Sequence, residues 1–80
     1  MIEVKVIAFA TLRRHLPDLA IGEEKILSVE PGTTLDEIQD MLHLPEEEVK
    51  VIMRNNVQAN PNDVAEDGDR IAFIPAVAGG

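Results

Sequence analysis

The sequence contains no cysteine, and this absence excludes a whole class of chemistry. The chain can form no disulfide, and it offers neither a thiolate nucleophile nor a cysteine ligand for a metal. Its two histidines, His15 and His43, have no evident acid or base partner in the sequence. We therefore expect no catalytic set of side chains and predict that the chain is not an enzyme by itself.

Basic residues are scarce as well. Seven Lys and Arg stand against fifteen Asp and Glu, which gives a formal net charge of −8. Proteins bind nucleic acid mainly by placing basic residues on phosphates, so we expect no nucleic-acid partner. Solubility is the simplest reason for the acidic surface, although a partner with a basic surface would also be attracted to it.

Long apolar runs are absent too. No stretch approaches the length of a membrane span, and Met1-Ile2-Glu3 lacks the charged and apolar regions that begin a signal peptide. We expect no membrane association and a cytoplasmic location. Of the 80 residues 45% are hydrophobic, yet only Phe9 and Phe73 are aromatic, which predicts one domain with a largely aliphatic core.

Alternating apolar and polar residues predict five strands, over residues 2–10, 25–30, 49–54, 57–59 and 70–76. The first two form a hairpin with a long loop, which contains a turn of helix over residues 11–16. Asn55-Asn56 is a plausible two-residue turn between the third and fourth strands, because asparagine tolerates a positive φ. In the last strand Ile71 and Phe73 share the face that we expect to be buried.

One helix is predicted after Pro31-Gly32. Thr34 and Glu37 have the spacing of a capping box, in which each side chain accepts from the other residue's backbone N–H. Leu35, Ile38, Met41 and Leu42 then recur at helical spacing, so we expect all of them in the core. The helix should end near residues 43–44, ahead of Pro45.

Two acidic segments were considered as metal sites and are interpreted as turns. The three adjacent carboxylates of Glu46-Glu47-Glu48 do not share one face. Asp67-Gly68-Asp69 lacks the spacing and the distal glutamate of a calcium loop. We therefore predict no metal site.

Apolar residues also occur where a half-exposed strand should be polar. Ile7 and Phe9 lie on the face of the first strand that begins with Glu3 and Lys5, and Ile74 lies on the face of the last strand that begins with Arg70. If the two strands are neighbours, these side chains form one exposed apolar patch, which is typical of a contact surface.

The C-terminal run is the most informative part of the sequence. It stays apolar to Ala78 and ends in Gly79-Gly80, so we divide the chain into a domain of residues 1–74 and an extended tail of residues 75–80. The tail could reach about 20 Å, and glycine can enter a passage too narrow for other residues. Such a tail could bring the Gly80 carboxyl group into a partner's pocket, where activation as an acyl-adenylate would make it reactive.

The chain resembles the ubiquitin-like sulfur carriers, and among them the small subunit of molybdopterin synthase more than the carrier of the thiamine pathway. The resemblance covers essentially the whole chain and is most specific in the C-terminal run. It rests on Phe9-Ala10-Thr11-Leu12-Arg13, Pro31-Gly32-Thr33-Thr34, Asp67-Gly68-Asp69-Arg70-Ile71-Ala72-Phe73-Ile74-Pro75 and Gly79-Gly80.

This resemblance implies an α+β, β-grasp fold with a mixed sheet of four to five strands and one main helix. It implies that an ATP-dependent activating enzyme adenylates Gly80, that the product is converted to a thiocarboxylate, and that the chain itself binds no cofactor. The sulfur would pass to a precursor in the large subunit of molybdopterin synthase, into which Gly79 and Gly80 insert. The residues implied to contact partners are Ile7, Phe9, Ile74, Pro75 and Val77.

Three alternatives stay open at this point. The same activated Gly80 could serve thiamine synthesis or tRNA thiolation, or it could join the chain to lysines of other proteins. The chain could also be a β-grasp module that binds partners without covalent chemistry.

Overall fold

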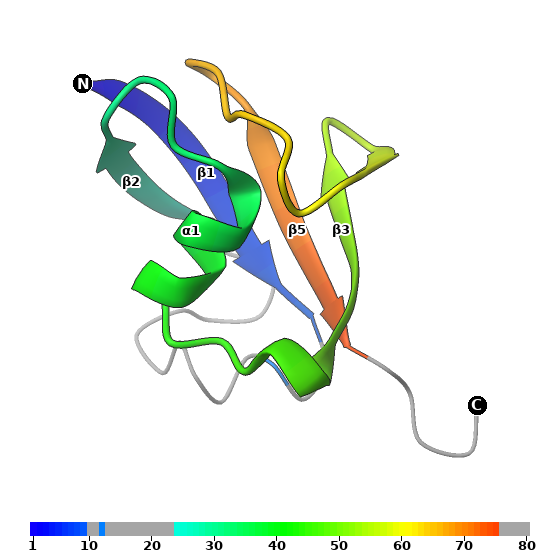
Figure 1. The fold of residues 1–80 in the computed structure, drawn as a ribbon. Helices are drawn as coiled ribbons and strands as arrows, with labels where there is room; N and C mark the ends of the chain where they lie inside the picture. Colours follow the sequence, from blue (N-terminus) through cyan, green and yellow to red (C-terminus); the bar gives the residue numbers. More distant parts are fainter. Residues whose placement is uncertain (10–11, 13–23, 76–80) are drawn as a thin grey trace.

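Five strands form one mixed sheet in the computed structural model, which describes residues 1–9, 12 and 24–75. The strands are β1 (Ile2–Ala8), β2 (Lys25–Val29), β3 (Val49–Arg54), β4 (Val57–Ala59) and β5 (Arg70–Pro75), in the order β2-β1-β5-β3-β4. The central pair, β1 and β5, is parallel, and the other neighbours are antiparallel. Helix α1 (Leu35–Met41) covers one face of the sheet (Figure 1). This is the predicted β-grasp fold, with the first and last strands side by side.

The core lies between α1 and the sheet. Val4 and Val6 of β1 and Ile71 and Phe73 of β5 are fully buried on the face toward the helix. They pack in one cluster with other buried side chains, among them Leu12, Leu35, Ile38 and Ile52. Burying a side chain of this size contributes about 1.5–3 kcal/mol, so the alternation along β1 and β5 is sufficient to fix which face of the sheet receives the helix.

The start of α1 has the predicted capping box. The backbone N–H of Thr34 donates to Oε1 of Glu37 at 2.9 Å, and the N–H of Glu37 donates to Oγ1 of Thr34 at 3.4 Å. Asp36 and Glu37 also place negative charge in the first turn, where the helix dipole is positive.

The end of α1 differs from the prediction. The helix stops at Met41, and His43 adopts a left-handed conformation with φ 58°. The N–H of His43 donates to Asp40 and the N–H of Leu44 donates to Gln39, which is the hydrogen-bond pattern of a Schellman motif. The chain therefore turns away two residues before the predicted end.

One core prediction for the helix is wrong. Leu35, Ile38 and Leu42 are buried as expected, but Met41 is 51% exposed and Gln39 is buried in its place. Successive helical residues are about 100° apart, so the mean direction of Leu35, Ile38 and Leu42 lies closer to Gln39 than to Met41. The Gln39 side chain is satisfied because its Nε2 donates to the carbonyl of Leu44 at 3.3 Å.

The β3–β4 hairpin has the predicted turn. Asn55 and Asn56 both have positive φ, 52° and 68°, as a two-residue turn of the primed type requires. In the loop that follows, Val64 is exposed and the neighbouring Ala65 is buried. Val64 contributes its backbone instead: its carbonyl accepts from Nη1 of Arg54 at 2.8 Å, and it forms an isolated bridge with Thr34.

Some expectations concern residues that the structure does not describe. The turn of helix over residues 11–16 lies outside the described residues except for Leu12, and so does the tail from residue 76 onward. Pro75, which we assigned to the tail, is the last residue of β5. Glu46–Glu48 forms the short 3-10 helix η2. None of the helices in the described ranges is long and apolar enough to cross a membrane.

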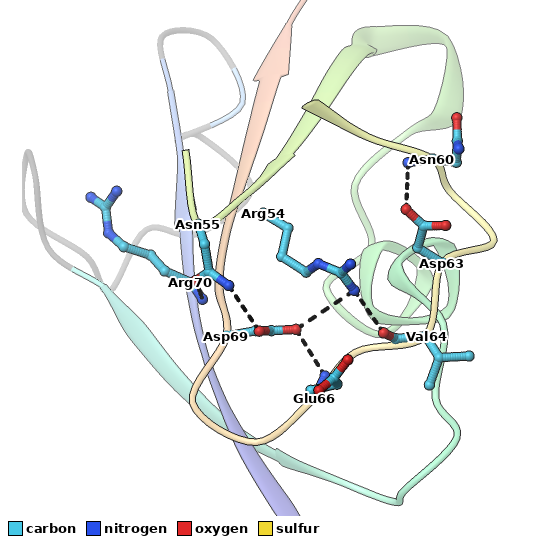
Figure 2. A network of polar contacts seen from close by, with 8 residues as sticks. All are labelled: Arg54, Asn55, Asn60, Asp63, Val64, Glu66, Asp69 and Arg70. Atoms are coloured by element: carbon cyan, nitrogen blue, oxygen red, sulfur yellow. Dashed lines mark hydrogen bonds and ion pairs between the residues drawn. The ribbon is translucent and has the colours of Figure 1, made fainter. Parts of the chain in front are cut away.

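A buried carboxylate holds the turn that precedes β5 (Figure 2). Asp69 is 7% exposed; its Oδ1 accepts from Nδ2 of Asn55 at 3.0 Å and its Oδ2 accepts from the N–H of Glu66 at 2.8 Å. Nη1 of Arg54 lies 3.9 Å from the same Oδ2. The Asp69 side chain thus joins the β3–β4 turn to the turn before β5.

The same turn is also joined to β1. Oδ1 of Asp67 accepts from the N–H of Glu3 at 2.8 Å, the N–H of Gly68 donates to the carbonyl of Glu3 at 2.7 Å, and the N–H of Lys5 donates to the carbonyl of Asp69 at 2.8 Å. Gly68 has φ 86°, a conformation that favours glycine. These contacts set the register in which β1 and β5 pair.

We predict that Asp69→Asn lowers the free energy of unfolding by about 1–3 kcal/mol. The carboxylate accepts two hydrogen bonds, one on each oxygen, and in asparagine an NH₂ group would replace one of these oxygens and lose that bond. Urea unfolding measures the loss. Asp63→Asn is the matched control, since Asp63 accepts one backbone N–H, that of Asn60, at a less buried site. Equal losses in the two variants would contradict the assigned role of Asp69.

Candidate functional site

The parallel pairing of β1 with β5 brings two distant parts of the sequence to the same end of the sheet, where both strands finish. Ile7 lies opposite Ala72 and Ala8 lies opposite Phe73. Beyond the last pair, the N–H of Phe9 donates to the carbonyl of Phe73 at 3.1 Å. Because both strands run in the same direction, Phe9 lies beside the last residues of β5, from which the C-terminal run continues.

The face of the sheet that points away from α1 carries an apolar patch at this end. Side chains alternate along a strand and cross-strand partners share a face, so the pairing assigns residues to this face. We call these residues the outer-face patch; they are Ile7, Phe9, Val51, Met53, Ala72 and Ile74. Three of them were identified from the sequence, and the pairing brings all three together.

The exposures of the patch residues correct one expectation. Phe9 is 41% exposed and Ile74 is half-buried, so both contribute accessible apolar surface. Ile7 is only 5% exposed, and the expectation that it is an exposed member of the patch is wrong. It lies on an interior strand of the sheet, where neighbours along β1 and on the adjacent strands surround a side chain. Ile7 supports the patch and offers little contact surface.

Pro75 is buried at the end of β5, opposite Val49 of β3. It lies two residues after Phe73 and on the same face of β5, so its side chain points away from the outer-face patch. Val77, Gly79 and Gly80, the other residues predicted to meet partners, lie outside the described residues.

Val51 and Met53 were missed in the sequence. Both are half-buried on β3, opposite Ile74 and Ala72. Alternation over residues 49–53 would put Val49 on the same face as these two, but the β3–β5 register shifts between Val49 and Val51, and Val49 packs against the core. The sequence shows that Val51 and Met53 are apolar, but it does not show which residues of other strands lie beside them.

The other half of the outer face is charged. Lys5 lies opposite Arg70 across the β1–β5 pair, and Nε of Arg70 donates to Glu24 in an ion pair. The face therefore has an apolar end beside the exit of β5 and a polar end beside the Asp67–Asp69 turn. A partner that covers the apolar end would lie directly over the start of the C-terminal run.

No metal site accompanies this face. Among the residues that the structure describes, no group of three or more His, Asp or Glu side chains is arranged to hold an ion. His43 is exposed at the end of α1, on the layer opposite the patch. The arrangement places an exposed apolar patch beside Pro75, the last described residue of β5.

Comparison with known protein families gives one match over nearly the whole chain. The ThiS family matches residues 6–80. Comparison with curated proteins finds no match.

Solved structures share the fold over almost all of the chain. The putative molybdopterin converting factor, subunit 1, from Pyrococcus furiosus is 21% identical, with a TM-score of 0.75, and the match covers 96% of this chain and 100% of that one. H. volcanii small archaeal modifier protein 1 is 17% identical, also with a TM-score of 0.75 and the same two coverages. A chain from the complex of subunits 1 and 2 of molybdopterin-converting factor from Helicobacter pylori 26695 is 25% identical, with a TM-score of 0.62 and coverages of 99% and 100%.

The different exposures of Ile7 and Phe9 give a test of the outer face. We predict that Ile7→Ala lowers the free energy of unfolding by about 2–4 kcal/mol, as core truncations do, and that Phe9→Ala changes it by less than about 1 kcal/mol. Thermal or urea unfolding of the two variants measures the difference. A larger loss for Phe9→Ala than for Ile7→Ala would contradict the described burial.

Proposed function

The chain belongs to the ThiS family of ubiquitin-like sulfur carriers, and on this basis we propose that it carries sulfur as a thiocarboxylate on Gly80 for the synthesis of molybdopterin. In this proposal the chain is the small subunit of a molybdopterin synthase and not an enzyme by itself. It binds no cofactor of its own, and the activating enzyme consumes the ATP.

The observation that supports the proposal best is the position of the outer-face patch. Its most accessible residue is Phe9, whose backbone N–H donates to the carbonyl of Phe73 near the end of β5. A partner that buries Phe9 and Ile74 would fix the orientation of Pro75 relative to its own surface, and so the direction in which the following residues leave the domain. Binding energy gained on the patch can therefore position a carboxyl group that lies five residues after Pro75.

The chemistry needs no side chain of this protein. An oxygen of the Gly80 carboxylate attacks the α-phosphate of ATP, which forms the acyl-adenylate and releases pyrophosphate. Hydrosulfide then attacks the acyl carbon, the bond to the phosphate oxygen breaks, and AMP leaves with the electron pair. The product is a thiocarboxylate whose sulfur can be transferred. Gly79 would let this end pass through a narrow channel, because glycine has no Cβ.

Two structural relatives favour molybdopterin as the destination. One is described as subunit 1 of a putative molybdopterin converting factor, and another comes from a complex of subunits 1 and 2 of such a factor. We infer that the partners of this chain are an ATP-dependent adenylating enzyme and a large synthase subunit. Delivery to thiamine synthesis or tRNA thiolation would use the same activated Gly80.

A second candidate function is protein modification. The similarity to a small archaeal modifier protein favours it, since the same adenylate could be attacked by a lysine amine in place of hydrosulfide. Lysine-linked adducts of the chain in cells would identify this route. The two functions share the activation step and differ only in the nucleophile.

The first experiment is the intact mass of the chain after incubation with ATP, an activating enzyme and sulfide. We expect a mass gain equal to the replacement of one oxygen by sulfur, located on Gly80 by fragmentation. The control is the variant that lacks Gly79 and Gly80, which should show no gain. If several competent activating enzymes leave the mass unchanged, the chain is a non-covalent binding module and the proposal is wrong.

We also predict that Phe9→Asp and Ile74→Asp each weaken binding to the large subunit or the activating enzyme by more than about 1 kcal/mol, roughly fivefold in Kd. The physical reason is that each places a carboxylate in an apolar contact. Calorimetric titration measures the change. Val57→Asp is the control, because Val57 is an exposed apolar residue outside the patch. Unchanged affinity in both patch variants would remove the outer-face patch from the proposal.

A further inference from the structure

Two grooves of about 470 Å³ each flank helix α1. One is lined by α1 together with β3 and β4, and the other by α1 together with β2. Each groove lies next to an edge of the sheet, since β4 and β2 are the outermost strands. The two edges differ in whether another strand could pair with them.

The β4 edge is poorly suited to further pairing. β4 is only three residues long, and Pro61 follows shortly after its end. β4 pairs only with residues 52–54 of the neighbouring β3. In the part of β3 that β4 does not reach, the register with β5 shifts between Val49 and Val51. Short strands, bulges and prolines are the features by which proteins protect a sheet edge from pairing.

The β2 edge has none of these features. Residues Lys25–Val29 form an uninterrupted strand without glycine or proline, and their register with β1 is continuous from Val6↔Lys25 to Ile2↔Val29. Within the described ranges no strand pairs with the other side of β2. Among the residues that the structure describes, the N–H and C=O groups on this side of β2 have no strand partner, so they offer a template for an added strand.

The groove beside β2 offers apolar contacts to such a strand. Met1 is 79% exposed and Met41 is 51% exposed, and both line the groove together with Val29. Methionine side chains are flexible and adapt to different apolar partners. On the other face of β2, Ile26 is also exposed, so an added strand would find apolar neighbours on both of its faces.

The rim of this groove is negatively charged. Glu30, Glu37 and Asp40 are exposed and line it, while no Lys or Arg is among its described lining residues. One oxygen of Glu37 accepts the capping hydrogen bond from the N–H of Thr34. A cationic side chain next to an apolar segment would complement this rim.

We propose that the β2 edge and the adjoining groove bind an extended segment of a partner protein that has apolar residues flanked by Lys or Arg. The segment pairs with β2 through main-chain hydrogen bonds, as in other cases of strand addition. Its alternate side chains contact Met41 in the groove and Ile26 on the other face, and its cations lie near Glu37 and Asp40. This site lies on a different part of the molecule from the outer-face patch and does not use Gly80.

A basic partner fits this edge better than a second copy of the chain. Pairing of two β2 edges would bring two copies with a net charge of −8 together, with their rim carboxylates close to each other. Like charges at an interface oppose association.

The test is a titration of the ¹⁵N-labelled chain with a synthetic peptide that has a Val-Ile-Val centre flanked by Lys residues, followed by NMR. We expect shifts at the amides of Lys25–Val29 and of Met41, and weaker binding when Glu replaces the flanking Lys or Pro replaces the central Ile. The variant that lacks Gly79 and Gly80 should bind equally well, so the result is independent of the proposed sulfur chemistry.

Two charge-matched variants sharpen the test. Asp40→Lys should raise Kd by about threefold or more, because an attraction on the surface becomes a repulsion, whereas Glu46→Lys, in the other groove, should leave Kd unchanged. Met41→Gln should weaken binding without a change in charge. No binding, equal binding of the Glu-flanked peptide, shifts at Phe9 and Ile74 in place of β2, or dimerisation through β2 would each overturn the proposal.

Discussion

The parallel pairing of β1 with β5 is the constraint on which the rest of the structure depends. Parallel strands need a long crossover connection, and here that connection contains β2, the helix and the β3–β4 hairpin. Backbone contacts from Glu3 and Lys5 to the turn at residues 67–69 fix the register at one end, and the hydrogen bond from Phe9 to Phe73 extends it at the other. Asp69 joins this arrangement to the hairpin turn at Asn55.

The two faces of the sheet have separate roles because of this register. One face buries Val4, Val6, Ile71 and Phe73 against the helix and accounts for folding. The other gathers the outer-face patch at the end of the sheet where β5 ends. In the proposed function this patch is the surface that positions the Gly80 carboxyl group. The helix layer is then left accessible, with its two grooves, when the outer face is covered.

Local sequence signals predicted much of the fold. The capping box at Thr34 and Glu37, the positive-φ turn at Asn55 and Asn56, and the alternation in β1 and β5 depend on neighbouring residues, and the structure confirms each of them. Predictions failed where the chain leaves a regular element. The Schellman motif ends α1 early, and the short helix turns Gln39 inward and Met41 outward. The end of the helix depends on the left-handed conformation of His43, which hydrophobic periodicity does not encode.

The sequence by itself determined the fold class, the buried faces of the central strands and the apolar, diglycine-ended character of the C-terminal run, because these follow from patterns along a single segment. Only the tertiary structure decided that Ile7 is covered while Phe9 is accessible, that Val51 and Met53 join the same patch, and that β2 is an outermost strand of the described sheet. The physical reason is that exposure and edge position depend on which strands become neighbours, and strands separated by tens of residues carry no local signal of their register.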